Sequence, residues 1–68
     1  MRYLTKYGVN GEQPGDAKYY VEIALNSLED KPADMIAAGS VAVETDTGKV
    51  YLFDETSGWV LMKTIKEG

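Results

Sequence analysis

The sequence predicts a small, mainly β protein built on a three-stranded antiparallel meander in its C-terminal half. Three short apolar runs lie at 41–43, 50–53 and 59–62, and turn-forming residues separate them. The first turn is the loop Asp46-Thr47-Gly48, whose last position favours a positive φ and therefore glycine. The second turn is rich in residues that close turns through local hydrogen bonds, and it ends at Gly58. We therefore expect Asp46, Gly48 and Gly58 to form the turns of the meander.

The N-terminal half is expected to add one or two strands. Residues 2–7 alternate between two faces, which is typical of a short edge strand or an extended arm. The stretch from Gly8 to Asp16 holds three glycines and a proline and is predicted to be a loop. Its length exceeds that of most hairpin connections, which suggests a segment with a function or a subunit contact.

Residues 17–28 fit both a strand and a helix, because their apolar side chains recur at either spacing. The β-branched and aromatic residues from Tyr19 to Ile23 favour a strand, which we place over residues 18–25. After Pro32, residues 33–38 have room for at most one helical turn, and Gly39 would end it.

These elements make one domain of 68 residues. We divide it into an arm and glycine-rich loop (1–16), a strand and connecting segment (17–38), the meander (39–64) and a polar tail (65–68). A chain of this size buries a small core and usually needs a disulfide, a metal or a partner. Cysteine and histidine are both absent, so no disulfide forms and the usual zinc ligands are lacking. Self-association is expected ahead of an unusually well-packed monomer.

Eleven acidic and seven basic residues give a net charge of −4. The basic residues are scattered singly, whereas a nucleic-acid interface needs a positive face that displaces counterions from phosphates. An anionic membrane would repel the chain for the same reason. Neither a signal-peptide core nor an 18-residue apolar run occurs, which predicts a soluble protein made in the cytoplasm.

Catalytic and metal-binding patterns are weak in this sequence. Glu44-x-Asp46-x-Gly48 only partly resembles a calcium loop, because glycine stands where the third ligand belongs. Pairs of carboxylates suit glycoside hydrolysis only across a cleft, which 68 residues hardly form. Serine and threonine hydroxyls lack a histidine base. The sequence predicts no enzyme, no cofactor and no metal.

Large apolar side chains are the strongest candidates for a functional surface. Val50 and Leu52 oppose Tyr51 and Phe53 along one run, so both faces of the predicted sheet are apolar. Either the N-terminal strands cover one face as a second layer, or that face packs on another subunit. The candidate contact residues are Tyr3, Tyr7, Tyr19, Tyr20, Tyr51, Phe53, Trp59 and Met62.

A small carbohydrate- or receptor-binding β module displayed on a particle is the alternative function. Tryptophan and tyrosine rings stack on sugar rings, and Trp59, directly after a Ser-Gly turn, is the candidate platform. Several copies displayed on a particle would gain avidity from weak single sites. A tryptophan at the start of a meander strand is more often part of a core.

The chain also resembles small structural proteins of tailed-bacteriophage and prophage virions over roughly residues 20–62. The matching pieces are Ile23–Ser27, Asp30–Pro32, Gly39-Ser40, Asp46–Lys49, Val50–Asp54 and Trp59-Val60. The arm with Gly8–Gly15 has no counterpart in that group. The resemblance implies a virion protein made in the bacterial host, such as a capsid decoration or a fibre or tail component. Its partners would be other virion proteins and its own copies, most plausibly as a trimer.

Overall fold

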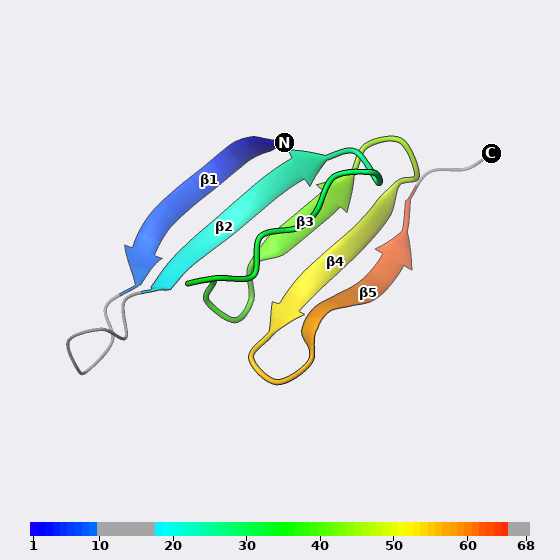
Figure 1. The fold of residues 1–68 in the computed structure, drawn as a ribbon. Coiled ribbons are helices and arrows are strands. Elements are labelled where there is room, and N and C mark those ends of the chain that lie inside the picture. Colours follow the sequence, from blue (N-terminus) through cyan, green and yellow to red (C-terminus); the bar gives the residue numbers. More distant parts are fainter. Residues whose placement is uncertain (10–17, 66–68) are drawn as a thin grey trace.

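The computed structural model describes residues 1–9 and 18–65, which form a single five-stranded sheet (Figure 1). The strands are β1 (Arg2–Val9), β2 (Lys18–Leu25), β3 (Val41–Glu44), β4 (Lys49–Asp54) and β5 (Gly58–Thr64), and they lie side by side in this order. The predicted mainly β fold is confirmed, including the C-terminal meander of β3, β4 and β5. The described residues contain no helix, and thus none long and apolar enough to cross a membrane.

β1 and β2 form an antiparallel pair at one side of the sheet. The strand predicted for residues 18–25 is confirmed, because β2 covers that range. β1 runs further than predicted and includes Gly8 and Val9. The predicted glycine-rich loop otherwise lies mostly outside the described residues.

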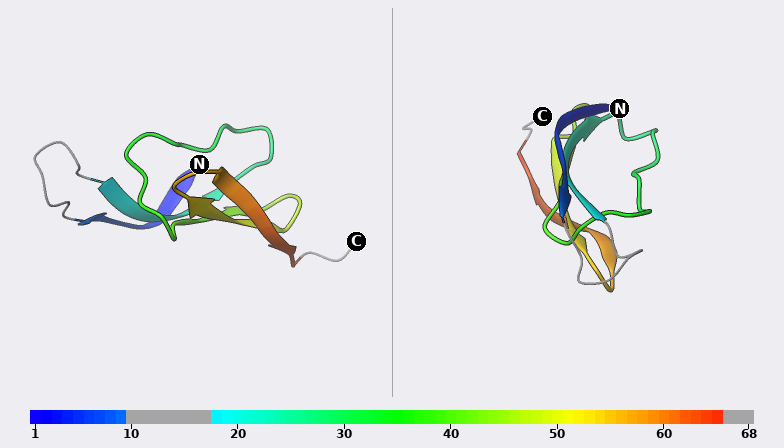
Figure 2. Two further views of the ribbon diagram at one scale, coloured as in Figure 1. Left: turned by 90° about the horizontal axis from the view of Figure 1, so that it is seen from below. Right: turned by 90° about the vertical axis from the view of Figure 1, so that its left-hand side faces the viewer.

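β2 and β3 are parallel, with Ile23 opposite Ala42, and residues 26–40 connect them. We call this segment the crossover. A parallel pair requires such a return path, because the chain must travel back along the sheet before the next strand starts. The crossover lies on one side of the sheet only, which is clear when the sheet is viewed edge-on (Figure 2). We call the side beneath it the covered face and the other side the open face.

Both meander turns form as predicted. Gly48 has a φ of 76° and Gly58 a φ of 78°, a region that costs other residues steric strain. The Asp54 carboxylate accepts hydrogen bonds from the backbone N–H groups of Thr56, at 3.0 Å, and Ser57, at 2.8 Å. This local hydrogen bonding closes the second turn.

The helical turn considered for residues 33–38 does not form. The Tyr19 N–H donates to the Met35 carbonyl at 2.8 Å, and the Ala37 N–H donates to the Tyr19 carbonyl at 2.8 Å. Ile36 thereby forms a parallel bridge with Tyr19. The cause is the difference in strand length: β2 has eight residues and β3 has four, so the start of β2 needs another backbone partner.

The core lies on the covered face. Val21, Ile23, Leu25, Ile36 and Ala42 are buried, and Tyr51, Phe53 and Trp59 pack against them. Of the alternatives for the N-terminal strands, the one in which they form a second layer is therefore wrong. β1 and β2 extend the sheet sideways, and the crossover covers the core instead.

Ser40 joins the crossover to the sheet just before β3. Its side chain is fully buried; the hydroxyl accepts from the Val21 N–H at 3.0 Å and donates to the Ala37 carbonyl at 2.8 Å. The hydroxyl thus satisfies a strand N–H at the point where the regular ladder between β2 and β3 has not yet begun.

Replacing Ser40 with alanine is expected to lower the free energy of unfolding by about 1–3 kcal/mol, because a buried N–H loses its acceptor. Urea denaturation followed by circular dichroism measures the change. Thr56→Ala, on the exposed second turn, is the control and should shift stability by less than about 0.5 kcal/mol. Equal effects of the two changes would show that the Ser40 hydroxyl contributes nothing to stability.

Candidate interaction face

The open face is defined by the strand residues that alternate with the buried ones. Strand register assigns Arg2, Thr5, Tyr7, Val9, Lys18, Tyr20, Glu22, Ala24, Val41, Val43, Val50, Leu52, Asp54, Val60 and Lys63 to it. No described segment crosses this side of the sheet (Figure 2). A single sheet with one covered side normally alternates apolar and polar residues, so an apolar open side is unusual.

Two rows of residues cross the open face at right angles to the strands. The first row is Arg2, Ala24, Val43, Val50 and Lys63, and the second is Thr5, Glu22, Val41, Leu52 and Val60. In β3, β4 and β5 these rows hold five aliphatic residues, which we call the aliphatic block: Val41, Val43, Val50, Leu52 and Val60. Leu52 and Val60 are 39% and 38% exposed even though they lie within a sheet.

A pair of tyrosines extends the aliphatic block toward β1. Tyr7 and Tyr20 lie opposite each other, with ring centroids 5.1 Å apart. Partial burial raises the pKa of Tyr20 above its ordinary value, and the nearby Glu22 carboxylate adds to the rise. The Tyr20 hydroxyl therefore stays protonated and uncharged at neutral pH, as suits a contact surface.

Charges of both signs surround the aliphatic block. Arg2 and Lys63 lie at the two ends of the first row, while Glu22 and Asp54 lie closer to the middle strands. The other acidic residues that the structure describes lie on the crossover, at the end of β3 and in the turns, at Glu29, Asp30, Asp34, Glu44, Asp46 and Glu55. Because Lys18 also lies on the open face, this face holds three basic and two acidic side chains, within a chain of charge −4.

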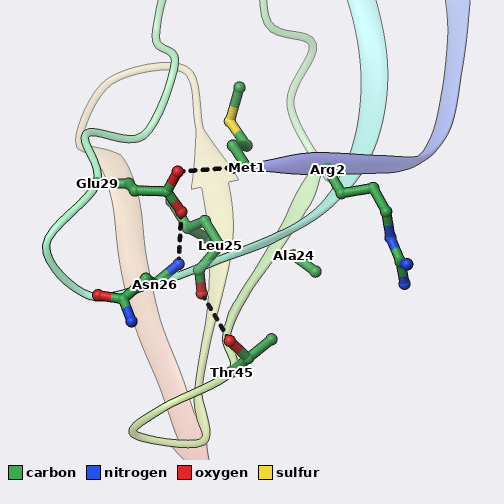
Figure 3. Close-up of a pocket in the computed structure, with 7 residues that line it drawn as sticks. All are labelled: Met1, Arg2, Ala24, Leu25, Asn26, Glu29 and Thr45. Atoms are coloured by element: carbon green, nitrogen blue, oxygen red, sulfur yellow. Dashed lines mark hydrogen bonds and ion pairs between the residues drawn. The ribbon is translucent and has the colours of Figure 1, made fainter.

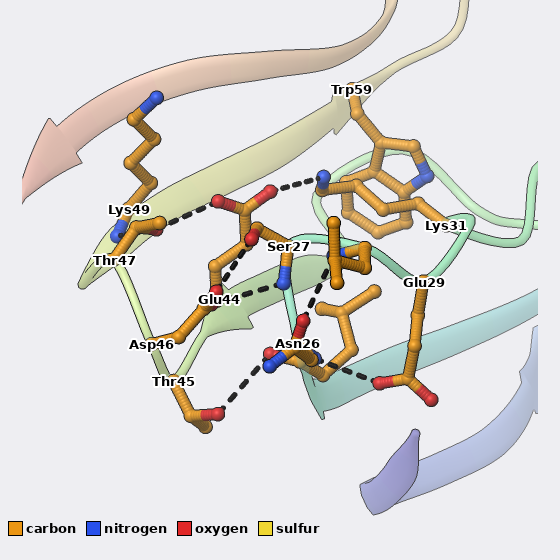
Figure 4. Close-up of polar contacts among 12 residues, drawn as sticks. Asn26, Ser27, Glu29, Lys31, Glu44, Thr45, Asp46, Thr47, Lys49 and Trp59 are labelled. Atoms are coloured by element: carbon orange, nitrogen blue, oxygen red, sulfur yellow. Dashed lines mark hydrogen bonds and ion pairs between the residues drawn. The ribbon is translucent and has the colours of Figure 1, made fainter.

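The covered face carries a polar cluster that attaches the crossover to the turn between β3 and β4 (Figure 4). The Lys31 ammonium donates to the buried Glu44 carboxylate at 2.8 Å and lies 4.0 Å from the centre of the Tyr51 ring. The Thr47 hydroxyl donates to the other oxygen of Glu44 at 2.7 Å. The Asp46 carboxylate accepts from both the N–H and the hydroxyl of Ser27. Because these bonds join chain segments, the cluster has a structural role.

Protonation of Glu44 at acidic pH is expected to weaken the attachment of the crossover and so to lower the stability of the fold. The hydrogen bond from Lys31, and then that from Thr47, hold the pKa of Glu44 below its ordinary value of 4.5. A carboxyl whose pKa is lower in the folded than in the unfolded chain adds stability above its unfolded pKa and loses it as the pH falls through its folded pKa. The melting temperature should therefore stay level from neutral pH down to about pH 5 and fall below about pH 4.5.

Melting curves across this pH range, for the parent chain and for Glu44→Gln, measure the effect. The variant should lose part of the acid dependence and keep the part from Asp46 and Asp54, whose pKa values hydrogen bonds also lower. A parent melting temperature that rises on acidification would contradict the assignment.

A shallow pocket of about 450 Å³ lies where the N-terminus meets the end of β2 (Figure 3). Glu29 is the carboxylate in it, and both oxygens are in use: one accepts from the Asn26 N–H at 2.7 Å and the other from the amino group of Met1 at 2.6 Å. These bonds lower the pKa of Glu29, the Asn26 bond most, so it stays ionised at neutral pH and is a poor general acid or base.

The candidate contact residues are divided between the two faces. Tyr7 and Tyr20 lie on the open face, whereas Tyr51, Phe53 and Trp59 pack against the core. Tyr3 and Tyr19 lie on the covered side at its margin, 42% and 38% exposed, with the Lys6 ammonium 5.0 and 4.8 Å from their rings. Met62 is at a β-bulge that places Lys63 opposite Val50.

The aliphatic block is missing from the residues chosen on the sequence. Its members are valines and one leucine, and the choice favoured aromatic rings over aliphatic side chains. The available signal was the alternation in β4, since Val50 and Leu52 face away from the two aromatic residues of that strand.

Metal ligands do not converge anywhere in the part of the chain that the structure describes. Asp46, in the first turn, and Asp54, at the end of β4, instead accept hydrogen bonds from backbone and hydroxyl groups. Comparisons of the sequence and fold with protein-family models, curated proteins and solved structures give no match.

Proposed function

We propose that this chain is a non-enzymatic structural protein of a phage virion that acts through subunit contacts at its open face. It would be a capsid decoration or a fibre or tail component. The observation that carries the proposal is the aliphatic block, which lies on the uncovered side of β3, β4 and β5. The assignment to a virion comes from the resemblance of residues 20–62.

Physical reasoning supports subunit contact as the role of the open face. Soluble monomers rarely leave contiguous apolar patches larger than a few hundred Å² in water. Covering the aliphatic block would remove apolar surface from water, which is favourable.

Composition of the particle tests this proposal. Density-purified particles, induced from a cell that carries the gene, are analysed by quantitative mass spectrometry. The chain should be present in a fixed ratio to the major capsid or tail protein. A chain that is abundant in the lysate and absent from intact particles would refute a virion role. A tailless or capsid-less mutant phage, run in parallel, assigns the chain to one part of the particle.

A glycan-binding module on a particle is the second candidate, and exposed tyrosines favour it. Trp59 is a poor platform, because it packs against Phe53 and its Nε1 donates to the Pro32 carbonyl at 2.7 Å. Tyr3 and Tyr19 present accessible rings beside the Lys6 ammonium. Saturable binding on a glycan array, lost in Tyr3→Ala and retained in Trp59→Phe, would support this function; no binding by a multivalent display would exclude it.

A further inference from the structure

We propose that the occupant of the open face is a second copy of this chain, turned end for end so that the two aliphatic blocks meet. The inference rests on the proposed function, since it names the partner for the same face. Three observations favour a copy of the chain over an unrelated protein: the area of the face, its charge and the placement of Arg2 relative to Glu22.

The area of the open face is close to the lower limit for a specific interface. Five strands at a spacing of about 4.8 Å, with four to eight residues at about 3.3 Å each, make a face of roughly 500 Å². A specific interface between proteins buries at least about 1,000 Å² in total, half from each partner. Two copies of the open face reach this limit only when most of each face is covered, so we expect a small interface.

The charge of the open face suits an identical partner. Two chains of net charge −4 repel each other when their acidic regions approach. Here most of the described acidic residues lie away from the open face, which instead holds Arg2, Lys18 and Lys63 together with Glu22 and Asp54. A strongly basic partner would find its complementary charge on the crossover instead.

The two rows of the open face determine how the copies are related. A two-fold axis between the rows and perpendicular to the strands places each row on the other row of its partner. Val43 then meets the partner's Val41, and Val50 meets the partner's Leu52. Arg2 comes to lie over the partner's Thr5, next to the partner's Glu22, where opposite charges attract.

The alternative arrangement, with an axis along the strands, is less favourable. It keeps each row level with the same row of the neighbouring copy. With the axis at the middle strand, β3, it would bring Arg2 and Lys63, the opposite ends of the first row, together as like charges. The trimer expected from the resemblance has this problem if its strands run along the three-fold axis, so we infer a two-fold pair.

Sedimentation velocity of the full chain at micromolar concentration tests the pairing. The expected mass is about 15 kDa, twice the 7.5 kDa of one chain. Leu52→Lys should raise the dissociation constant about 100-fold or more, because it puts a charge in the centre of the apolar contact. Leu28→Lys carries the same substitution at a side chain that is 92% exposed on the crossover, and it should leave the mass unchanged.

A charge exchange tests the end-for-end arrangement without altering the block. Arg2→Glu alone and Glu22→Arg alone should each weaken the pair about tenfold, and the double variant should regain most of the affinity. Circular dichroism confirms that every variant keeps the sheet.

Several outcomes would overturn the inference. They are a monomer at all concentrations, a mass of three chains, equal behaviour of Leu52→Lys and Leu28→Lys, or no recovery in the charge-exchanged double variant. None of them bears on whether the chain is found in particles. A monomeric chain that is present in purified particles would retain the proposed function and assign the open face to another virion protein. A dimer that is absent from particles would support the pairing of two copies and refute the virion role.

Discussion

Replacing Ile23 with alanine is expected to cost about 2–5 kcal/mol of unfolding free energy. Ile23 is 1% exposed at the middle of β2, the strand with neighbours on both sides that also lies beneath the crossover. A domain of 68 residues has roughly 3–10 kcal/mol to lose, so the variant should be partly or wholly unfolded at 25 °C.

Urea denaturation monitored by circular dichroism measures this loss. Leu28→Ala is the matched control, because that leucine is 92% exposed and should change stability by less than about 0.5 kcal/mol. If the two variants unfolded at the same urea concentration, the covered face would not be the core of the domain.

Trp59→Ala is expected to lower the free energy of unfolding by about 2–4 kcal/mol, below the loss for a fully buried tryptophan because Trp59 is half-buried. The substitution removes the edge-to-face contact with Phe53, whose ring centroid is 5.0 Å away, and the hydrogen bond to the Pro32 carbonyl. Both contacts attach the crossover and β5 to the same part of the sheet.

Trp59→Phe separates the two contributions. It keeps an aromatic ring against Phe53 and loses the hydrogen bond, so it should cost about 1 kcal/mol. Thermal unfolding by circular dichroism measures both variants. If Trp59→Phe cost as much as Trp59→Ala, the ring contact would contribute nothing and the hydrogen bond would account for the whole effect.

Local chemistry explains why the meander was predictable. Gly48 and Gly58 occupy positive-φ positions that few other residues tolerate, and the Asp54 side chain bonds to the backbone two and three residues later. Each of these constraints acts within a few residues. They are visible in the sequence because the residue type and the backbone conformation belong to the same short segment.

Hydrogen bonds between distant parts of the chain explain why the helical turn predicted for residues 33–38 does not form. Residues 33–38 had local room for a helical turn, yet the free backbone groups of Tyr19 draw Met35 and Ala37 into an extended path. Tyr19 is 16 or more residues away from these partners in the sequence. Propensity within a short window carries no information about such a partner, so tertiary hydrogen bonding decided the conformation.

The apolar faces of the sheet were also only partly predictable from the sequence. Successive side chains of a strand point to opposite faces, and those of β4 are apolar on both sides. The sequence therefore predicts that both faces of the sheet are apolar at this strand. The choice between the faces depends on the side that the crossover takes, and the Trp59 bond to Pro32 and the Lys31 bond to Glu44 hold the crossover there. The aromatic residues of β4 and β5 consequently pack against the core, while the aliphatic block remains on the open face.

The sequence alone thus determined the strands, the two meander turns and the presence of more apolar surface than a single layer covers. Only the tertiary structure decided that β2 and β3 pair in parallel, that the crossover rather than β1 covers the core, and that the aliphatic block remains open. The reason is physical. Turns and strands follow from interactions within a few residues, whereas the choice of covered face depends on contacts between residues more than ten positions apart.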